Sequence, residues 1–320
     1  MRPETEHGTR RGGWLFGALA LGVFGALVWA ERRHGLRVPV EDTGERVARN
    51  IAVAGATAVA VQLAERPLVT PLARAVARRR VGLAYWLQAR LGLSDLVRDA
   101  LAVVLMDYTL YAWHVLSHRA PWLYRFHQVH DTDLDLDAST ALRFHFGEFV
   151  AGAPYRAAQV ALIGVSPRAL TAWQRLTSLS VMFHHSNVRL PVGVERWLRR
   201  LVVTPRLHGI HHSIVREEQD SNWSSGLTVW DRLHGTYRDD VPQAAIAIGV
   251  PAYRDPGDVT LPRILAMPFT DGVAEWRLPD GTEPVRRMHD LEPHARGGTG
   301  GVAGTASDVA LAERNDRYAG

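Results

Sequence analysis

The sequence predicts an all-α integral-membrane protein. Several apolar stretches approach or reach the length of a membrane-crossing helix, and histidines recur three and four residues apart, the spacing that brings side chains to one face of a helix. The chain contains no cysteine, which excludes disulfides and thiolate metal sites, so any bound metal must be held by His, Asp or Glu. The predicted fold is therefore a set of helices whose chemistry depends on imidazoles.

The first predicted span is the stretch 14-WLFGALALGVFGALVWA-30, seventeen residues without a charge. It follows the basic 10-RRGG-13, and Trp14 and Trp29 stand near its ends as interfacial anchors. A cleaved signal peptide is the alternative. The apolar part is longer than a signal peptide needs, and 30-AERRHG-35 offers no cleavage site between small residues, so a retained membrane helix is favoured.

Further apolar stretches cover residues 51–64, 100–116, 149–165 and 169–183. Pro67 and Pro71 are expected to break the helix that contains the first of these stretches. The basic run 74-RAVARRR-80 that follows is expected to be a cytoplasmic flank.

One acid, Asp107, lies inside the stretch 100–116. An ionisable group at membrane depth is costly, so Asp107 either has a polar partner or belongs to a site.

The charge balance points to lipid rather than nucleic acid. All 37 basic residues are arginine and the pI is about 9.7, but the arginines form short clusters beside apolar runs, such as 78-RRR-80 and 196-RWLRR-200. Such clusters suit anionic lipid head groups. Because the chain has no basic stripe interleaved with aromatic residues, no nucleic-acid partner is expected.

Ten of the fifteen histidines fall between residues 114 and 212. The pairs His114/His118 and His127/His130 and the triplet His208/His211/His212 can each aim imidazoles at one point, and His145, His184 and His185 lie between them in sequence. Ten imidazoles exceed what one four- to six-coordinate ion needs, so two metal ions are the economical interpretation.

The same segments resemble the fatty acid hydroxylase, or sterol desaturase, superfamily of integral-membrane oxygenases. The resemblance covers roughly residues 45–240 and rests on the order of the histidine boxes and their surroundings: 114-HVLSH-118, 124-YRFHQVH-130, 137-DASTALRFHFGE-148, 184-HHSNVRLP-191, 205-PRLHGIHHS-213 and 230-WDRLHGTY-237. It implies a helical membrane bundle with a cytoplasmic, histidine-rich cap that holds two metal ions, normally iron.

The chemistry that the resemblance implies is O2-dependent hydroxylation or desaturation of a lipid C–H bond, with electrons from an external NAD(P)H-linked donor such as a cytochrome, a ferredoxin or a flavoprotein reductase. The expected partners are thus a membrane lipid and an electron-transfer protein. The expected metal ligands are His114, His118, His127, His130, His184, His185, His208, His211 and His212, with Asp131 and His145 as additional candidates.

Asp131 departs from the family pattern, in which a third histidine normally closes the second box. Aspartate can itself ligate iron, it can orient a neighbouring imidazole, or its presence can mark a weakened metal site. Retained metal binding is favoured because the other boxes are intact.

Other polar residues near the boxes have structural alternatives. The acidic run 131-DTDLDLD-137 is expected to be a solvated loop with a helix cap at Asp137 or Ser139, because it lacks the Gly and closing Glu of a calcium loop. Glu148 is either a ligand or a base near the metal, or structural. Asn187 and Asn222 either orient ligands or cap turns, and Trp230 and Asp231 are expected to lock the cap.

The predicted organisation has four parts: a membrane helix and loop (1–44), the histidine-box oxygenase domain (45–240), a C-terminal extension (241–285) and a flexible tail (286–320) that includes the Gly-rich 296–306.

Two other functions are weighed against the oxygenase. Because histidine spacing does not distinguish iron from zinc, a zinc-dependent membrane hydrolase or isomerase is the chief alternative. A non-catalytic metal-binding membrane protein is the third. Sterol, fatty acyl, carotenoid and ether-lipid substrates all remain open.

Overall fold

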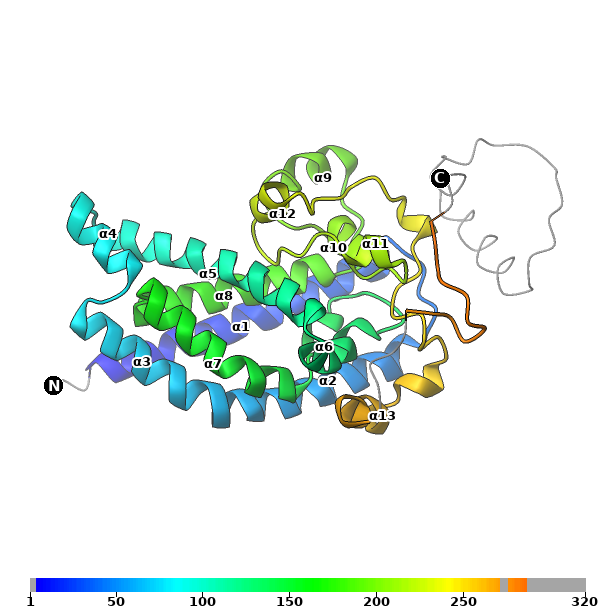
Figure 1. Ribbon diagram of the computed structural model, residues 1–320, viewed down its shortest axis with the longest axis horizontal. Helices are drawn as coiled ribbons and strands as arrows, with labels where there is room; N and C mark the ends of the chain where they lie inside the picture. The colour runs from blue at the N-terminus through cyan, green and yellow to red at the C-terminus, as the bar shows by residue number, and fades with distance from the viewer. Residues whose placement is uncertain (1–3, 271–275, 287–320) are drawn as a thin grey trace.

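The computed structural model describes residues 4–270 and 276–286, and this part of the chain is helical with three isolated β-bridges and no sheet (Figure 1). The all-α prediction is confirmed. The helices are α1 (Glu4–Arg33), α2 (Thr43–Ala60), η1 (Val61–Glu65), α3 (Arg66–Arg79), α4 (Leu83–Leu91), α5 (Asp95–Arg119), α6 (Pro121–Asp131), η2 (Thr140–Leu142), α7 (Phe146–Ile163), α8 (Pro167–His185), α9 (Val192–Leu198), α10 (Pro205–His211), α11 (Arg216–Gln219), α12 (Val229–His234), η3 (Gln243–Ala245), η4 (Pro256–Val259), α13 (Leu261–Ala266) and η5 (Met267–Phe269).

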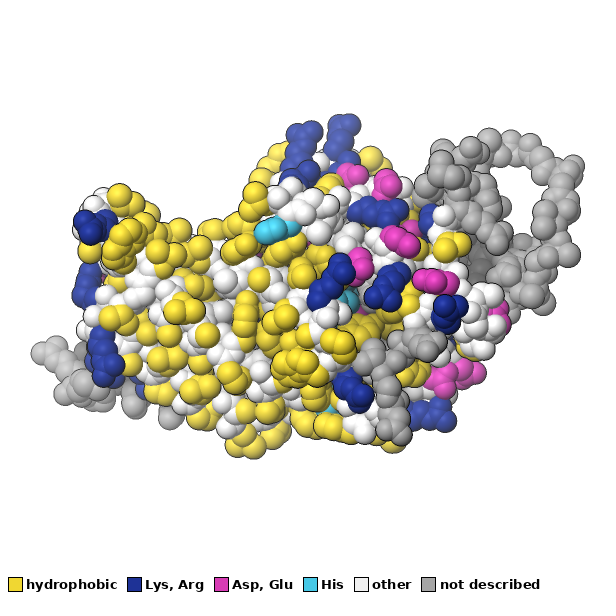
Figure 2. Space-filling model, in the orientation of Figure 1, with side chains coloured by type: hydrophobic (Ala, Val, Ile, Leu, Met, Phe, Trp, Pro, Cys, Tyr) yellow, Lys and Arg dark blue, Asp and Glu magenta, His cyan; other side chains and the backbone are white. Residues whose placement is uncertain are grey.

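The long helices form a bundle, and the short ones gather at one end of it as a cap (Figure 1). Three helical segments among the described residues are long and apolar enough to cross a membrane: Gly12–Arg33, Thr43–Leu91 and Asp95–Arg119. α7 packs against α2 and α3, and α8 packs against α5 and α1. Figure 2 shows the matching surface, a broad hydrophobic face over the bundle with charged side chains mainly on the cap and at the opposite end.

The expected break at Pro67 and Pro71 is wrong. The chain stays helical from Thr43 to Arg79, because one wide turn, Val61–Glu65, is inserted between α2 and α3. Such a turn shifts the hydrogen-bond register, and Pro67 then falls in the first turn of α3, where a missing N–H costs little. The segment therefore forms one long helical candidate span.

Asp107 is held by polar partners from the cap. The Trp230 indole Nε1–H donates to Asp107 Oδ2 at 2.7 Å and the Leu227 N–H donates to the same oxygen at 3.1 Å. Asp231 in turn accepts hydrogen bonds from the backbone N–H groups of Trp223 and Ser224. The prediction that Trp230 and Asp231 lock the cap is confirmed, and Asp107 serves as its anchor on α5.

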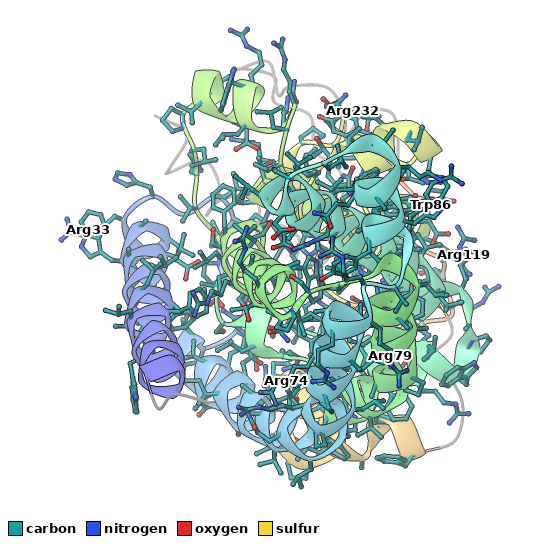
Figure 3. All side chains as sticks on the ribbon, turned by 90° about the vertical axis from the view of Figure 1, so that its left-hand side faces the viewer. Arg33, Arg74, Arg79, Trp86, Arg119 and Arg232 are labelled. Atoms are coloured by element: carbon teal, nitrogen blue, oxygen red, sulfur yellow. The ribbon has the colours of Figure 1, made fainter. Side chains whose placement is uncertain are left out.

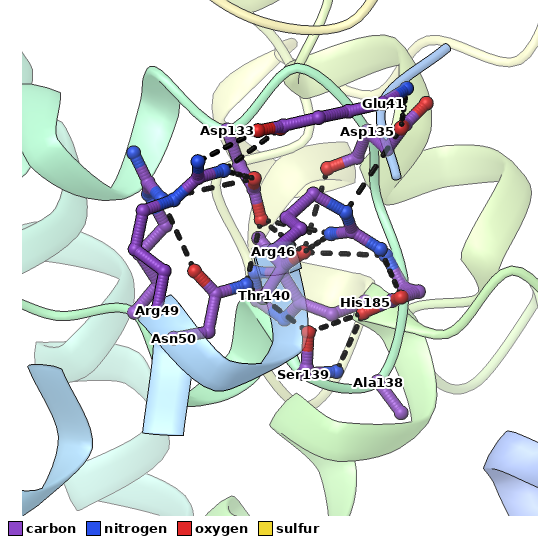
Figure 4. Close-up of polar contacts among 12 residues, drawn as sticks. Glu41, Arg46, Arg49, Asn50, Asp133, Asp135, Ala138, Ser139, Thr140 and His185 are labelled. Carbon is purple, nitrogen blue, oxygen red and sulfur yellow. Dashed lines mark hydrogen bonds and ion pairs between the residues drawn. The ribbon is translucent and has the colours of Figure 1, made fainter. Parts of the chain in front are cut away.

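The acidic run 131–137 is buried, so the expectation of a solvated loop is wrong. Arg46 of α2 reaches into it, donating to Asp133 at 3.0 Å and to Asp137, with Asp135 at 3.9 Å (Figure 4). Although burial opposes its charge, the guanidinium groups of Arg46 and Arg143 hold the pKa of Asp133 below its usual range. Arginines from other segments give the carboxylates the charge partners that burial requires.

Ser139 occupies the N-cap position of η2, as expected, but its side chain makes no capping hydrogen bond to the helix. Asp137 Oδ1 accepts from the Ser139 backbone N–H and hydroxyl, each at 2.7 Å. The loop is thereby fixed directly after Asp131, and its position sets that of the second histidine box.

The basic run 74–80 and the cap lie at opposite ends of the bundle. Figure 3 looks along the bundle from the end opposite the cap and shows Arg74 and Arg79 at this near end of α3. The run therefore cannot share a membrane face with the cap if the bundle spans the bilayer. Of the predicted tail, 286–320, all but Arg286 lies outside the described residues, and the domain boundaries stay predictions.

Candidate metal centre

Nine of the predicted histidine ligands converge between the end of the bundle and the cap. His114 and His118 project from the last turns of α5, His127 and His130 from α6, and the remaining five come from the end of α8 and from α10: His184, His185, His208, His211 and His212. α6 and α10 both begin with a proline in their first turn, which sets the start of each helix and hence the direction of its histidines.

One group contains four imidazoles whose Nε2 atoms point at each other. His185 Nε2 lies 2.9 Å from His130 Nε2 and 2.9 Å from His208 Nε2, and His208 Nε2 lies 3.1 Å from His212 Nε2. We call His130, His185, His208 and His212 the four-histidine group; all four side chains are buried.

Hydrogen bonds between the rings do not account for this geometry. His185 Nδ1 lies 2.8 Å from the Val181 carbonyl, which only accepts, so in the neutral ring Nδ1 carries the proton and Nε2 a single lone pair. Only one of the two neighbouring nitrogens can donate to that lone pair. Two ligands about 2.1 Å from one ion and 90° apart stand about 3.0 Å from each other, whereas tetrahedral ligands stand about 3.4 Å apart. The spacing is that of neighbouring ligands in an octahedral or related arrangement.

A second group combines imidazoles with Asp131. Donor atoms of His114, His118 and His211 lie within 4.8 Å of one another, as do those of His118, His127 and Asp131. Asp131 Oδ2 is 3.6 Å from His118 Nε2, and Asp131 Oδ1 is 3.9 Å from both His127 Nε2 and His212 Nδ1. We call His114, His118, His127, His211 and Asp131 the mixed group, and His212 borders both groups.

The outward nitrogens of the mixed group are anchored by acceptors. His114 Nδ1 donates to the Trp223 carbonyl at 2.7 Å and His127 Nδ1 to Glu148 Oε1 at 3.0 Å. His211 Nδ1 donates to the carbonyls of Gln219 and Ser221. Metal-ligating histidines characteristically give their second N–H to a carbonyl or carboxylate, which fixes the tautomer and leaves the inner nitrogen bare.

Four inner donor atoms of the mixed group have no hydrogen-bond partner in the protein. His118 Nε2, His127 Nε2, His211 Nε2 and Asp131 Oδ1 are buried without a hydrogen bond. Leaving buried acceptors unpaired is costly, and a cation between them would satisfy them together. The donor set, imidazole nitrogen with one carboxylate and no sulfur, suits iron or zinc. The residues thus fit a metal in both groups.

The electrostatics of the mixed group also favours a cation. Burial raises the pKa of Asp131 to about 7, an effect that His127 opposes. Burial opposes a charge on His127, but Glu148 and Asp131 raise its pKa to about 9. Burial lowers the pKa of His211 to about 3, so its lone pair is available at neutral pH. Two carboxylates are therefore buried where positive charge is needed; a proton on His127 supplies it in the metal-free protein, and a bound cation would replace that proton.

Two of the predicted ligands are not brought into either group. His145 Nδ1 accepts from the Gly147 N–H and caps α7, while its Nε2 lies 3.2 Å from the Leu265 carbonyl. His184 lies beside the four-histidine group, with its ring centroid 4.1 Å from that of His208, but none of the donor clusters includes its nitrogens.

Both asparagines are structural, holding backbone segments together. Asn187 binds the backbone of Arg37 through both side-chain atoms, and Asn222 binds the carbonyls of Leu207 and Arg238.

Sequence reasoning missed two residues at this site. Gln219 donates from Nε2 to Asp131 Oδ2 at 3.2 Å. The buried Trp223 packs edge-on against His118 and His211, with ring centroids 4.6 and 5.0 Å away. Both residues follow the histidine box 208–212, but the chain leaves helix α10 at His211, so spacing from that box gives no signal for them.

Comparison with known proteins agrees with this site. The fatty acid hydroxylase family model matches residues 100–236, which contain both groups. The chain is 30% identical over 151 residues to the ornithine lipid hydroxylase OlsE of Rhizobium tropici, covering 47% of this chain and 44% of that protein. It is 27% identical over 152 residues to cholesterol 25-hydroxylase of Mus musculus, covering 47% and 50%.

Human alkylglycerol monooxygenase is 26% identical over 132 residues, covering 41% of this chain and 28% of that protein. The chain thus spans about half or less of the length of these curated relatives, and no solved structure matches it significantly. The family match, the relatives and the buried histidine boxes lead to one conclusion: residues 100–236 form a domain of the fatty acid hydroxylase family.

Proposed function

We propose that this protein is a membrane-bound oxygenase that hydroxylates or desaturates a lipid C–H bond at a dinuclear iron centre. The observation that carries the proposal is the pair of buried donor groups. In the four-histidine group the Nε2 atoms face each other without enough protons for hydrogen bonds between all of them. In the mixed group, inner nitrogens and one oxygen of Asp131 have no hydrogen-bond partner. The four-histidine group would hold one ion and the mixed group the other, with His184 beside them.

The chain's own residues orient the ligands and shield them from water. Glu148 and the carbonyls of Trp223, Gln219 and Ser221 hold the ring orientation of the mixed group, and the buried Trp223 ring covers one side of it. An iron pair with O2 supplies the oxidising power that abstraction of hydrogen from an unactivated chain needs and that side chains lack. Because His114 and His118 end a candidate span, a lipid can approach the site from the bilayer.

The relatives favour hydroxylation. The two hydroxylases and the monooxygenase are named for adding oxygen to a lipid, although they differ in the lipid. A zinc hydrolase or isomerase remains the alternative, since the donor set also suits zinc.

The deciding experiment is elemental analysis of untagged protein purified from membranes after growth with iron, followed by lipid product analysis under 18O2 with a reductase system. Incorporation of 18O into lipid supports the proposal, whereas lipid turnover without O2 supports the alternative.

We further propose that the metal centre faces the cytoplasm, where an external NAD(P)H-linked cytochrome, ferredoxin or flavoprotein reductase would supply electrons. This requires the Arg74–Arg79 end of the bundle to face the other way. Because the chain has no cysteine, single cysteines report sidedness cleanly. In intact cells, a membrane-impermeant thiol reagent is expected to label Val81→Cys but not Asp255→Cys on the cap; the reverse pattern would contradict the assignment.

Asp131→Asn is expected to weaken the ion in the mixed group. The amide keeps the size of the side chain but removes the only carboxylate of that group, so its metal affinity is expected to fall by at least about tenfold. The ion in the four-histidine group is expected to remain. Metal content after graded chelation measures this, with Asp135→Asn as the matched buried control. Equal retention of both ions in Asp131→Asn would show that Asp131 is not a ligand.

A further inference from the structure

A shoulder of two short helices projects from the cap beside the bundle (Figure 1). It consists of α9 with the following turn and of α12, joined by hydrogen bonds from the Val203 N–H to the Gly226 carbonyl and from the Thr228 N–H to the Leu201 carbonyl. We call residues 192–201 and 229–234 the shoulder. It contains none of the metal-binding candidates and lies outside the three candidate spans.

The shoulder exposes large apolar side chains. Val192 is 76% exposed, Trp197 58% and Leu233 68%, and three more exposed apolar residues accompany them: Val194, Leu201 and Val229. Figure 2 shows hydrophobic side chains along the edge of the shoulder nearest to the hydrophobic surface over α5. A cluster of this kind on a short, otherwise charged unit marks an interaction site rather than ordinary surface.

Arginines surround these apolar side chains. Residues 189–206 contain five arginines against one glutamate, a net charge of +4 that equals the formal net charge of the whole chain. Arg196 and Arg200 are exposed, and Arg232 lies at the periphery of the molecule in Figure 3. Exposed apolar residues with a dense arginine cluster are the composition that binds anionic lipid surfaces.

The attachment of the shoulder places it at the bilayer. Trp230 of α12 donates to Asp107, and its ring packs against that of Tyr108 with centroids 5.0 Å apart. Both partners lie in the middle of the candidate span Asp95–Arg119. If this helix crosses the membrane, residues 107–119 rise about 18 Å from the attachment point to its cap-side end, so the shoulder beside it lies close to the bilayer surface at that end.

A pocket between the shoulder and α10 offers room for a head group. It has a volume of about 290 Å³ and is lined by Arg196, Arg199 and Arg206 together with Glu195 and Asp239. Asp239 is paired with Arg199 at 2.9 Å and Glu195 interacts with Arg206, so the three arginines of the lining exceed its two carboxylates by one positive charge. Glu195 is 4% exposed, and neither carboxylate oxygen has a hydrogen bond of ordinary geometry. A phosphate with a neighbouring hydroxyl donor complements this lining.

We propose that the shoulder lies in the head-group layer of the membrane that α5 crosses and binds anionic phospholipid, with its apolar side chains inserted between the lipids and its arginines on the phosphates. This inference does not depend on the metal centre or on the reaction, so its test and the oxygenase test can fail separately.

The absence of cysteine allows a direct test. Val192→Cys carries an environment-sensitive fluorophore in nanodiscs, with Leu162→Cys on the hydrophobic bundle face and Asp255→Cys on the cap as references. Quenching is compared between nitroxide-labelled phosphatidylglycerol and nitroxide-labelled phosphatidylcholine. The probe at position 192 is expected to be quenched, and several-fold more by phosphatidylglycerol than by phosphatidylcholine.

Charge variants identify the arginines as the cause. Arg196→Gln with Arg200→Gln is expected to remove the phosphatidylglycerol preference, and Arg216→Gln with Arg263→Gln, elsewhere on the cap, to keep it. The proposal is overturned if position 192 behaves like position 255, which would mean that the shoulder is aqueous. Equal quenching by the two lipids, or by phosphatidylethanolamine and phosphatidylglycerol, would overturn the anionic head group. Far-ultraviolet circular dichroism of each variant verifies that the fold is kept.

Discussion

Replacing His185 with glutamine is expected to remove the ion from the four-histidine group and to abolish lipid oxidation. The His185 Nε2 atom lies 2.9 Å from two other Nε2 atoms of the group, those of His130 and His208, so its loss removes a donor that adjoins two others. Metal content is expected to fall from two ions per chain to one. Activity is expected to fall by at least about a hundredfold, because the proposed reaction depends on both ions and one of them is lost.

His145→Gln is the matched control for this prediction. His145 is also a buried histidine, but it caps α7, and both of its ring nitrogens have backbone partners. A modest loss of thermal stability, about 1 kcal/mol for a lost cap, and unchanged metal content are expected. If both variants lost the same amount of metal, the effect would reflect misfolding rather than ligation.

The second large effect is expected from Arg46→Met. The variant keeps an apolar stem of similar length but leaves Asp133 and Asp137 buried without their principal cation. Breaking a buried ion pair by removing one partner costs about 3–5 kcal/mol. Unfolding followed by tryptophan fluorescence in detergent or nanodiscs is expected to show this loss, with metal binding weakened as well, because the loop fixes Asp131 at the end of α6.

Arg74→Met, at an exposed position of α3, is the control and is expected to change stability by less than about 0.5 kcal/mol. In the double variant Arg46→Met/Asp133→Asn, part of the lost stability is expected to return, because one of the unpaired charges is gone. A double variant as unstable as the sum of the two single variants would contradict the ion-pair explanation.

The acidic run 131–137 shows why the local sequence pattern did not predict burial. Four aspartates at alternate positions favour a solvated loop on polarity alone. The partner of the last three, Arg46, lies some ninety positions earlier in the chain. The prolines at 67 and 71 give a similar lesson, since a single wide turn allows a helix to continue through residues that usually end it. In the first case a residue distant in sequence, and in the second a wide helical turn, overrides the local preference of the residues.

The sequence by itself determined the all-α fold, three apolar stretches that lie in candidate spans, the family resemblance and the set of imidazoles, because helix period, span length and residue chemistry are properties of short segments. Only the tertiary structure decided which imidazoles share a group, that Asp131 stands among them, that His145 stands apart, and that the shoulder is anchored at Asp107. The physical reason is that a metal site and a membrane-facing surface depend on distances between elements, which crossing angles and buried polar contacts fix and which sequence spacing does not contain.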